Sequence, residues 1–389
     1  MNSLQRVRVI FPFLFHFNFF PMNKMISIIK FTSCLAVALA VAGTAFAQDK
    51  TEVMTTPFGA TVPPDAEIDT TPFGGVKISI AAGAGTMSKM SVVSFPLYNH
   101  PEGVGAVVGK ITAVTSTTIS DENAEWAVPS FVTAESPMFL RIKSGAAEGR
   151  TFQITSNTAD TLTISSSDGV STTAIDFVSL GVVADDTYEI IVGDTILSAF
   201  GRGTIDGDDA PLGGSNINNA DVIRYYNNGQ WQLYFYSLAS NTWENLSRIS
   251  VNNMVISPDS CILYERRMGT LSFVLTGFVP TVQRQVVVRN GGATMLSAFL
   301  PVDITLNELG LEKMPGWVKS TVFNSADKVS LFLNGNWMIC YHNGTRWTNL
   351  SRQAVGDSII DAGTAMNIER ADSLQTTGTV FKQSLPYEL

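Results

Sequence analysis

The sequence predicts an all-β protein built of several sandwich-like or barrel-like modules, and three observations lead to this prediction. Between residues 76 and 192, short runs rich in Val, Ile, Thr and Phe are bounded by Gly, Asn, Asp and Ser, a pattern typical of strands and turns. No window of this region keeps a helical period of about 3.6 residues for more than a turn or two. The third observation is an internal repeat in the C-terminal half.

The N-terminal β domain is expected to span 76–192. Residues 140–149 followed by 151–155 (LRIKSGAAEG and TFQIT) predict a hairpin, because two alternating runs flank a turn-forming stretch. A second turn at 156–160 (SNTAD) leads into a further strand at 161–164.

The first 75 residues predict export. Residues 22–47 resemble a signal peptide, with Lys24 and Lys30 ahead of an apolar run and a small-x-small cleavage site at the end. We interpret residues 1–21 as sequence upstream of the true start codon, Met22 or Met25, with an extra membrane anchor as the alternative, so that 1–47 is leader. Residues 48–75 form a Pro- and Thr-rich lead-in in which the pentapeptide TTPFG occurs twice.

The charge of the chain disfavours two classes of partner. Removal of residues 1–47 takes away four Lys/Arg and no acidic residue, which leaves 21 basic against 34 acidic residues and a net charge of −13. Nucleic acids and anionic membrane surfaces attract basic proteins, so neither is an expected partner. The leader is the only long apolar run, and no transmembrane segment is expected in the mature chain.

The C-terminal half is expected to hold two copies of one module, at 193–283 and 284–389. The stretch 220–248 returns as 326–352, with the matched pairs Asp221/Asp327, Trp231/Trp337, Trp243/Trp347 and Arg248/Arg352. The match extends upstream, where 195–200 resembles 294–299, and downstream, where 264–266 resembles 368–370.

Each copy carries an Asn-Gly dipeptide between two apolar and aromatic runs, at 228–229 and at 334–335. Asn-Gly favours the type I′ turn of a two-residue hairpin, because both central positions need a positive φ. We therefore expect Trp231 and Trp337, which follow by two residues, to lie on strands.

These patterns resemble a family of bacterial, signal-peptide-bearing, β-rich secreted proteins of unassigned function with a duplicated C-terminal Trp module. The resemblance rests on TTPFGGVKISI, GKITAVTSTTIS, LRIKSGAAEGRTFQITSNTADTLTIS and VGDTILSAF, and on the AD, NG-x-W, Trp and E-R elements of the repeat. It covers almost the whole mature chain. It implies a secreted β protein and assigns no catalytic or binding residue.

Few residues point to catalysis, and we expect no enzyme. The mature chain has two histidines, His100 in a turn and His342 at the position that Tyr236 holds in the first copy, and it lacks a G-x-S-x-G elbow. Two histidines and two dispersed cysteines, Cys261 and Cys340, are a poor set for zinc. We expect both cysteines to be buried thiols, with a disulfide between them as the alternative.

Calcium is the one metal that the sequence suggests. Asp206, Asp208 and Asp209 lie in a Gly-rich loop and supply the hard oxygen ligands that calcium prefers. The order of an EF-hand loop is missing and the second copy lacks the acidic run, so a solvated acidic loop is the favoured interpretation and no cofactor is expected.

The repeated aromatic residues are the remaining candidates for binding, because flat rings can stack on sugars. Strand alternation places Trp231, Leu233 and Phe235 on one face and Tyr234 and Tyr236 on the other. We interpret the tryptophan face as core, which leaves Tyr234, Tyr236 and, in the second copy, Tyr341 as candidate ligand-binding residues.

Three functions follow, in order of preference. The first is an exported, non-catalytic structural or adhesion-type protein of the periplasm, cell surface or extracellular space, with surface polysaccharide or other envelope proteins as partners. The second is a carbohydrate-binding protein that uses the repeated aromatic residues. The third is a β-rich hydrolase, for which the repeated Glu265 and Glu369 are the acids to consider.

Overall fold

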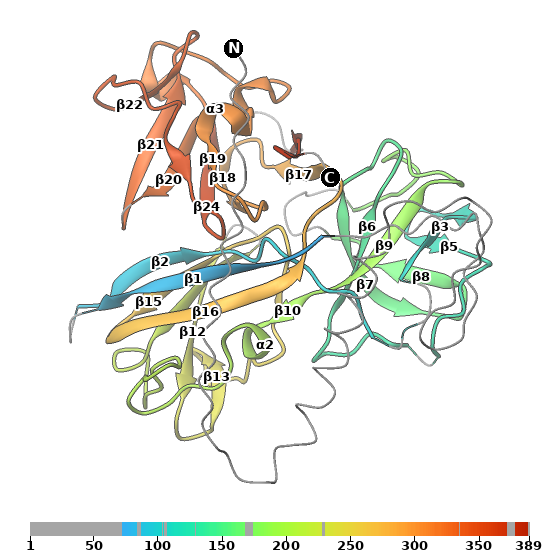
Figure 1. Ribbon diagram of the computed structural model, residues 1–389, viewed down its shortest axis with the longest axis horizontal. Helices are drawn as coiled ribbons and strands as arrows, with labels where there is room; N and C mark the ends of the chain where they lie inside the picture. Colours follow the sequence, from blue (N-terminus) through green and yellow to red (C-terminus); the bar gives the residue numbers. More distant parts are fainter. Residues whose placement is uncertain are drawn as a thin grey trace, which may run out of the picture. The chain divides into compact units, whose positions relative to one another are not determined.

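The computed structural model describes residues 72–387, except 84–86, 103, 105–106, 129, 168–173, 228–229, 334 and 372–377. The expected leader, nearly all of the lead-in and most of both Asn-Gly turns lie outside the described residues. Strands are the dominant regular structure of the described chain, and its helices are short (Figure 1). The all-β prediction is confirmed. Within these ranges, no helix has the length and apolar character needed to cross a membrane.

Seven strands between residues 108 and 192 form one antiparallel sheet in the order β3-β9-β6-β7-β8-β5-β4. Leu140 pairs with Phe152, so the hairpin expected at 140–155 is present. The strands are β3 (Val108–Lys110), β4 (Ala113–Val114), β5 (Thr118–Ser120), β6 (Met138–Ile142), β7 (Thr151–Asn157), β8 (Thr161–Ile164) and β9 (Thr187–Val192).

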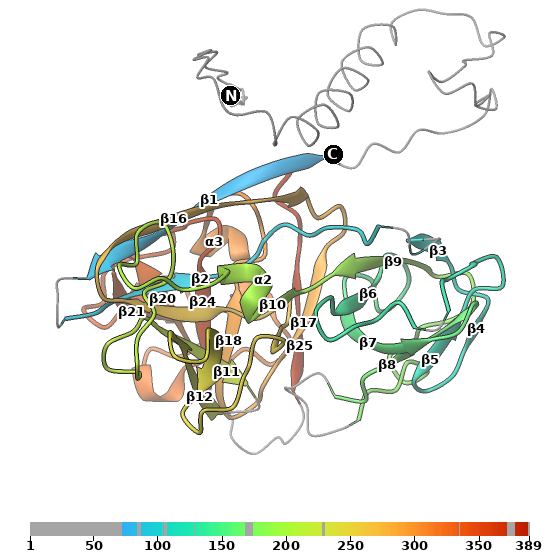
Figure 2. The ribbon, with the colours of Figure 1, turned by 90° about the horizontal axis from the view of Figure 1, so that it is seen from below.

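A first five-stranded sheet has the order β13-β12-β11-β15-β2, and two strand pairs, β1-β16 and β10-β14, accompany it. Figure 2 shows β1 running beside β16 along its length. The elements are β1 (Phe73–Gly83), β2 (Lys89–Val93), β10 (Asp194–Thr195), α2 (Ile196–Phe200), β11 (Val222–Asn227), β12 (Gln230–Ser237), β13 (Thr242–Asn245), β14 (Val255–Ile256), β15 (Ile262–Arg266) and β16 (Gly269–Phe278).

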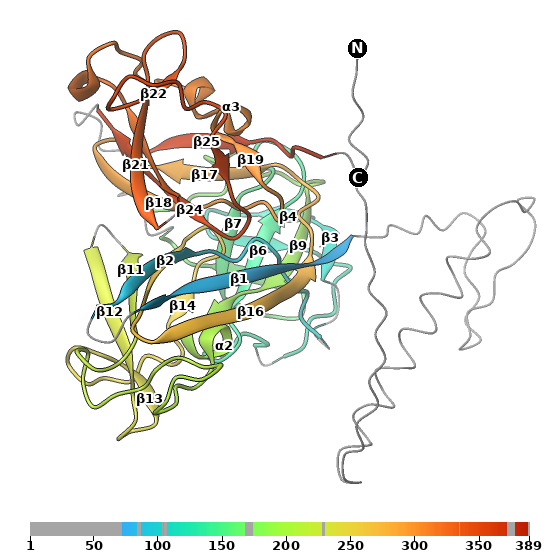
Figure 3. The ribbon, with the colours of Figure 1, turned by 60° about the vertical axis from the view of Figure 1, so that its left-hand side comes forward.

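A second five-stranded sheet has the order β18-β24-β20-β21-β22, accompanied by the pairs β17-β25 and β19-β23. Figure 3 shows β17 beside β25. The elements are β17 (Arg284–Val288), β18 (Gly292–Ser297), β19 (Ile304–Thr305), α3 (Leu306–Leu309), η2 (Leu311–Lys313), η3 (Phe323–Ser325), β20 (Lys328–Leu333), β21 (Asn336–His342), β22 (Trp347–Asn349), β23 (Ile359–Ile360), β24 (Ala365–Arg370) and β25 (Thr379–Gln383).

The two five-stranded sheets have the same topology. Read in chain order, β2, β11, β12, β13 and β15 take the places of β18, β20, β21, β22 and β24. In each set a short helix also follows the first strand of a small pair, α2 in β10-β14 and α3 in β19-β23. The pair β1-β16 likewise takes the place of β17-β25. We call β1, β2 and β10–β16 the first module and β17–β25 the second module.

The seven-stranded sheet is inserted into the first module. It lies between β2 and β10, where the second module has only residues 298–303 between β18 and β19. Asn99 and Val192 form an isolated bridge, so the two ends of the insertion are adjacent. Strands β1 and β2 were expected to belong to the N-terminal domain 76–192. They pair instead with β16 and β15 of the first module.

One part of the sequence match is wrong. Residues 195–200 begin a helix, in which the Thr195 hydroxyl accepts a hydrogen bond from the Ser198 backbone N–H, whereas 294–299 lie mostly in strand β18. The structural counterpart of Thr195 is Thr305, which caps α3 through the Glu308 backbone N–H. A threonine before an apolar run is compatible with a strand and with a helix N-cap. The similar sequences 195–200 and 294–299 therefore adopt different secondary structures.

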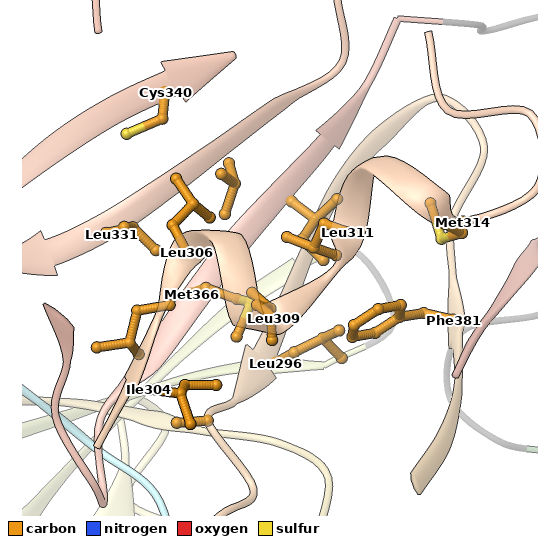
Figure 4. Close-up of a cluster of buried hydrophobic side chains, with 14 of the residues drawn as sticks. Leu296, Ile304, Leu306, Leu309, Leu311, Met314, Leu331, Cys340, Met366 and Phe381 are labelled. Atoms are coloured by element: carbon orange, nitrogen blue, oxygen red, sulfur yellow. The ribbon is translucent and has the colours of Figure 1, made fainter. Parts of the chain in front are cut away.

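Each of the three sheets has its own hydrophobic core. The core of the second module gathers strand residues around α3, including Leu296, Leu306, Leu309 and Met366 (Figure 4). A smaller cluster joins the two modules through strands β2, β15, β18 and β24, and consists of Val92, Cys261, Leu263, Met295 and Ala365. Another joins the insertion to the first module through Tyr98, Phe139 and Ile191.

Candidate functional site

The repeated Asp and Arg residues form one buried ion pair in each module. Asp221 Oδ2 lies 2.6 Å from Arg266 Nη1, and Asp327 Oδ2 lies 2.8 Å from Arg370 Nε. Each aspartate also accepts backbone N–H bonds, from Leu212 and Arg267 in the first module and from Val318 and Ala371 in the second. These repeated residues have a structural role.

The second tryptophan of each repeat belongs to a core. Trp243 is 0% exposed, and its Nε1 donates to the Gly201 carbonyl at 2.8 Å. Trp347 is 1% exposed, and its Nε1 donates to Glu312 Oε2 at 3.3 Å. Both rings therefore combine apolar burial with a satisfied indole N–H.

The predicted assignment of strand faces on β12 is wrong for the tyrosines, which meet the core, whereas Phe235 is 2% exposed and therefore buried as predicted. Tyr234 and Tyr236 are 4% and 0% exposed and pack with the core of the first module. The Tyr236 hydroxyl donates to Asn241 Oδ1 at 2.6 Å, and the Tyr234 hydroxyl donates to Gln232 Oε1. Burial raises the pKa of Tyr234 to about 12.

Tyr341 is also buried and is no candidate for stacking on a ligand. Its ring, 4% exposed, meets Phe323 edge-on with 5.5 Å between centroids. All three predicted ligand-binding tyrosines are thus inaccessible from solvent.

The first tryptophan of each repeat is exposed, contrary to the prediction that it is core. Trp231 is 43% exposed and lies beside Tyr226, with 5.0 Å between ring centroids. Trp337 is 36% exposed and lies beside Phe332 at 5.2 Å. In both modules the two rings are directly paired across a hairpin, and we call these sets the aromatic pairs.

The aromatic pairs occupy equivalent places near the ends of two hairpins. Asn227 pairs with Gln230 and Leu333 with Asn336, which leaves two residues to connect the strands in each case. Gly335 has a φ of 81°, the left-handed conformation that the Asn-Gly dipeptide predicted. The register of such a hairpin places Tyr226 opposite Trp231, so the position of the Asn-Gly dipeptide in the sequence is the signal that identifies this pair.

The three candidate calcium ligands do not converge. Asp206, Asp208 and Asp209 are exposed, and among the described residues no three His, Cys, Asp or Glu side chains come together as a metal site. The loop is held by Arg266 instead, whose guanidinium donates to the carbonyls of Gly207 and Ala210. This contact gives the loop the structural role of satisfying a buried arginine.

His100 belongs to a buried polar cluster at the junction of the insertion with the first module. Glu189, whose side chain is 1% exposed, lies 3.3 Å from Arg141, 3.5 Å from His100 and 3.9 Å from Lys143. Burial acts to raise the pKa of Glu189, but the His100 hydrogen bond and the neighbouring cations outweigh it, so this pKa lies below its usual value.

His342 and the two cysteines are also enclosed. The His342 ring meets Trp347 edge-on at 5.5 Å and accepts a hydrogen bond from the Gly344 backbone, and burial lowers its pKa. Cys261 and Cys340 are free, buried thiols in different modules, as expected, and burial raises the pKa of each to about 12.

No protein-family model, no curated protein and no solved structure matches this chain. The candidate site therefore rests on its own geometry. Within the described residues, the exposed tryptophans of the two aromatic pairs are repeated aromatic residues that no core encloses.

Proposed function

We propose that this chain is an exported, non-catalytic adhesion-type protein that holds saccharide surfaces through its two aromatic pairs. The supporting observation is that Trp231 and Trp337 stay 43% and 36% exposed at equivalent positions of the two modules. Exposure matters here because an indole presents a flat apolar ring on which a sugar can stack, whereas the repeated and exposed Leu246 and Leu350 have no ring. A large apolar ring that recurs on the surface is typical of an interaction site.

Saccharides suit these rings for a physical reason. One face of a pyranose ring presents C–H groups, which bury against a flat aromatic ring while the hydroxyl groups stay in water. Tyr226 and Phe332 support the exposed indoles from one side and fix their orientation. Two such sites on one chain bind a repetitive polymer with an avidity that exceeds the affinity of either site.

Retention on insoluble polysaccharides and on glycan arrays tests this proposal. We expect Trp231→Ala and Trp337→Ala each to weaken binding by about tenfold, the equivalent of about 1.4 kcal/mol. The double variant should lose retention.

Leu246→Ala and Leu350→Ala are the matched controls, because these leucines are also repeated and are 60% and 59% exposed. They should leave retention unchanged. Binding that survives the double tryptophan variant, or no binding to any glycan, would contradict the proposal. Release of soluble sugar by the purified protein would favour the hydrolase hypothesis instead.

A further inference from the structure

A groove of about 420 Å³ lies on the second module beside Trp347. Its wall takes Asn307 from α3, Trp347 from β22 with the preceding Arg346, and residues 354–358 from the loop after β22 (Figure 1 labels both elements). Every residue of the wall lies in the continuously described stretches 230–333 and 335–371. The volume falls in the range of about 300–1,000 Å³ that is typical of small-molecule sites.

The equivalent place in the first module is filled by a side chain. Asn252 and Gly356 hold equivalent positions, since each carbonyl accepts a backbone N–H from the short helix of its module, at 3.1 and 2.8 Å. In the first module the Asn252 Oδ1 also accepts the backbone N–H of Trp243 at 2.9 Å. Gly356 has no side chain that could do the same for Trp347.

The backbone N–H of Trp347 is therefore a donor that faces the groove. The Trp347 carbonyl accepts the N–H of Val355 at 3.1 Å, so it points away from β21 and toward the loop 354–358. The N–H and C=O of one strand residue point to the same side, which turns the Trp347 N–H toward this loop as well. No described residue accepts it in a hydrogen bond. Since buried backbone N–H groups are nearly always paired, this donor favours an acceptor on a ligand.

The side chains of the wall add one charge of each sign. Arg346 is exposed, and its guanidinium makes no hydrogen bond or ion pair with any residue that the structure describes. Asp357 is oriented by Asn307, whose Nδ2 donates to Oδ1 at 3.0 Å, and this contact leaves Oδ2 of the carboxylate for another donor. The groove thus presents donors from Arg346 and Trp347 and acceptors from Asp357.

We propose that this groove binds a free α-amino acid with a small aliphatic side chain. Its carboxylate accepts hydrogen bonds from the Trp347 N–H and the Arg346 guanidinium, whose planar fork matches a carboxylate. Its ammonium group donates to the Asp357 carboxylate. A zwitterion balances the two charges of the wall, and the apolar Ala354 and Val355 offer contact to the side chain. This site goes beyond the proposed saccharide binding and does not depend on it.

Calorimetry with L-alanine tests the proposal, and two analogues of the same size separate its two charged ends. Propionate lacks the ammonium group, and L-alaninamide lacks the carboxylate. We expect each analogue to bind more weakly than alanine by about tenfold or more, because each leaves one charge of the wall unanswered. In a ¹⁵N-labelled sample, alanine should shift the backbone amide signal of Trp347.

Single substitutions assign the two ends to their partners. Arg346→Gln and Asp357→Asn should each lower the affinity for alanine by about tenfold. Arg352→Gln is the matched control, because it removes an exposed arginine of the same module that does not line the groove. It should bind alanine as the wild type does.

A double variant that copies the first module should close the groove. Gly356→Asn supplies the side chain that Asn252 provides there, but a Cβ at position 356 would collide with the side chain of Asn307. Asn307→Leu is therefore made with it, because Leu197 is the equivalent helix residue of the first module. The double variant should lose alanine binding. Its thermal unfolding, and its retention on polysaccharide through the aromatic pairs, show whether it is folded.

The outcomes separate this site from the proposed function. Alanine binding that persists in Arg346→Gln, in Asp357→Asn or in the folded double variant overturns the amino-acid site, as does the absence of alanine binding to the wild type. Propionate that binds as tightly as alanine shows a site for anions alone and also overturns it. None of these results changes tryptophan-dependent retention on polysaccharide, which tests the proposed function by itself.

Discussion

Asp221 and Arg266 form an ion pair with 2.6 Å between Oδ2 and Nη1, and their side chains are only 0% and 1% exposed. Their partners lie on a loop and on a strand, since Arg266 also donates to the carbonyl of Ala210 in the loop and Asp221 accepts from the hydroxyl of Tyr264 on β15. The same pairing recurs as Asp327 and Arg370. The late E-R element of the repeat is thus explained by its arginine rather than by its glutamate.

We expect Asp221→Ala to destabilise the protein by about 3–5 kcal/mol, because it leaves the buried Arg266 guanidinium without its counter-charge. Urea unfolding followed by circular dichroism measures this change. Asp208→Ala, in the exposed part of the neighbouring loop, is the control and should unfold at the wild-type midpoint. Equal effects of both substitutions would contradict the structural role.

The two tryptophans of one repeat should differ in their contribution to stability. Trp243→Ala removes a fully buried ring and should cost about 3–5 kcal/mol. Trp231→Ala removes a ring that is 43% exposed and should cost no more than about 1 kcal/mol. The same unfolding experiment compares them, and a loss for Trp231→Ala as large as for Trp243→Ala would show that the exposed ring is part of the core.

Stability should fall on acidification through Glu189. The pKa of this carboxyl is lower in the folded protein than its ordinary value of 4.5, so the unfolded chain binds the proton more readily. Its contribution is present above pH 4.5 and is lost as the pH falls through the folded pKa. Melting temperatures measured from neutral to acid pH test this. Compared with the wild type, Glu189→Gln should melt at a lower temperature at pH 7, and its melting temperature should change less with pH. Glu125→Gln, at an exposed position, should retain the wild-type profile.

The two thiols should be inert in the native protein. Burial raises the pKa of Cys261 and of Cys340 to about 12, which leaves almost no thiolate at neutral pH. A thiol reagent should label both residues orders of magnitude more slowly in native protein than in urea. Immediate labelling, or the loss of both thiols from the count in urea without reductant, would contradict this.

Local patterns in the sequence were sufficient to predict the strands and hairpins. Alternation and turn residues located the β6–β7 hairpin, and the Asn-Gly dipeptides located the ends of β11 and β20. These elements depend on neighbouring residues, so a short window contains the information that forms them.

The inward face of β12 was not predictable in the same way. Alternation divides Trp231 and Phe235 from Tyr234 and Tyr236, but it does not say which set meets the core. Tyrosines whose hydroxyls find partners fill a core as well as tryptophan does. Exposure also falls along the strand, from exposed at residues 230–232 to buried at 234–237, because only one end of the hairpin is covered.

The insertion could not be predicted from the sequence, for a different reason. The pairs β1-β16 and β2-β15 join segments that no local pattern connects, and only the assembled fold shows which strands are neighbours. The same limit applies to the cavity of about 400 Å³ whose wall takes residues from the insertion and from both modules, which are far apart along the chain.

The pairing of β1 with β16 also governs the order in which the chain can fold. Ser79 and Ser272 are hydrogen-bonded neighbours separated by 193 positions, so the first module cannot close until nearly 280 residues have emerged. The second module needs only the contiguous stretch 284–383. Contacts between segments so far apart in the sequence form slowly, and the strand edges that they will join stay unpaired until then. Under the export that we propose, the whole chain has been synthesised before it folds. Strand β16 is then available to pair with β1 from the start of folding, so β1 does not remain unpaired while β16 is being made.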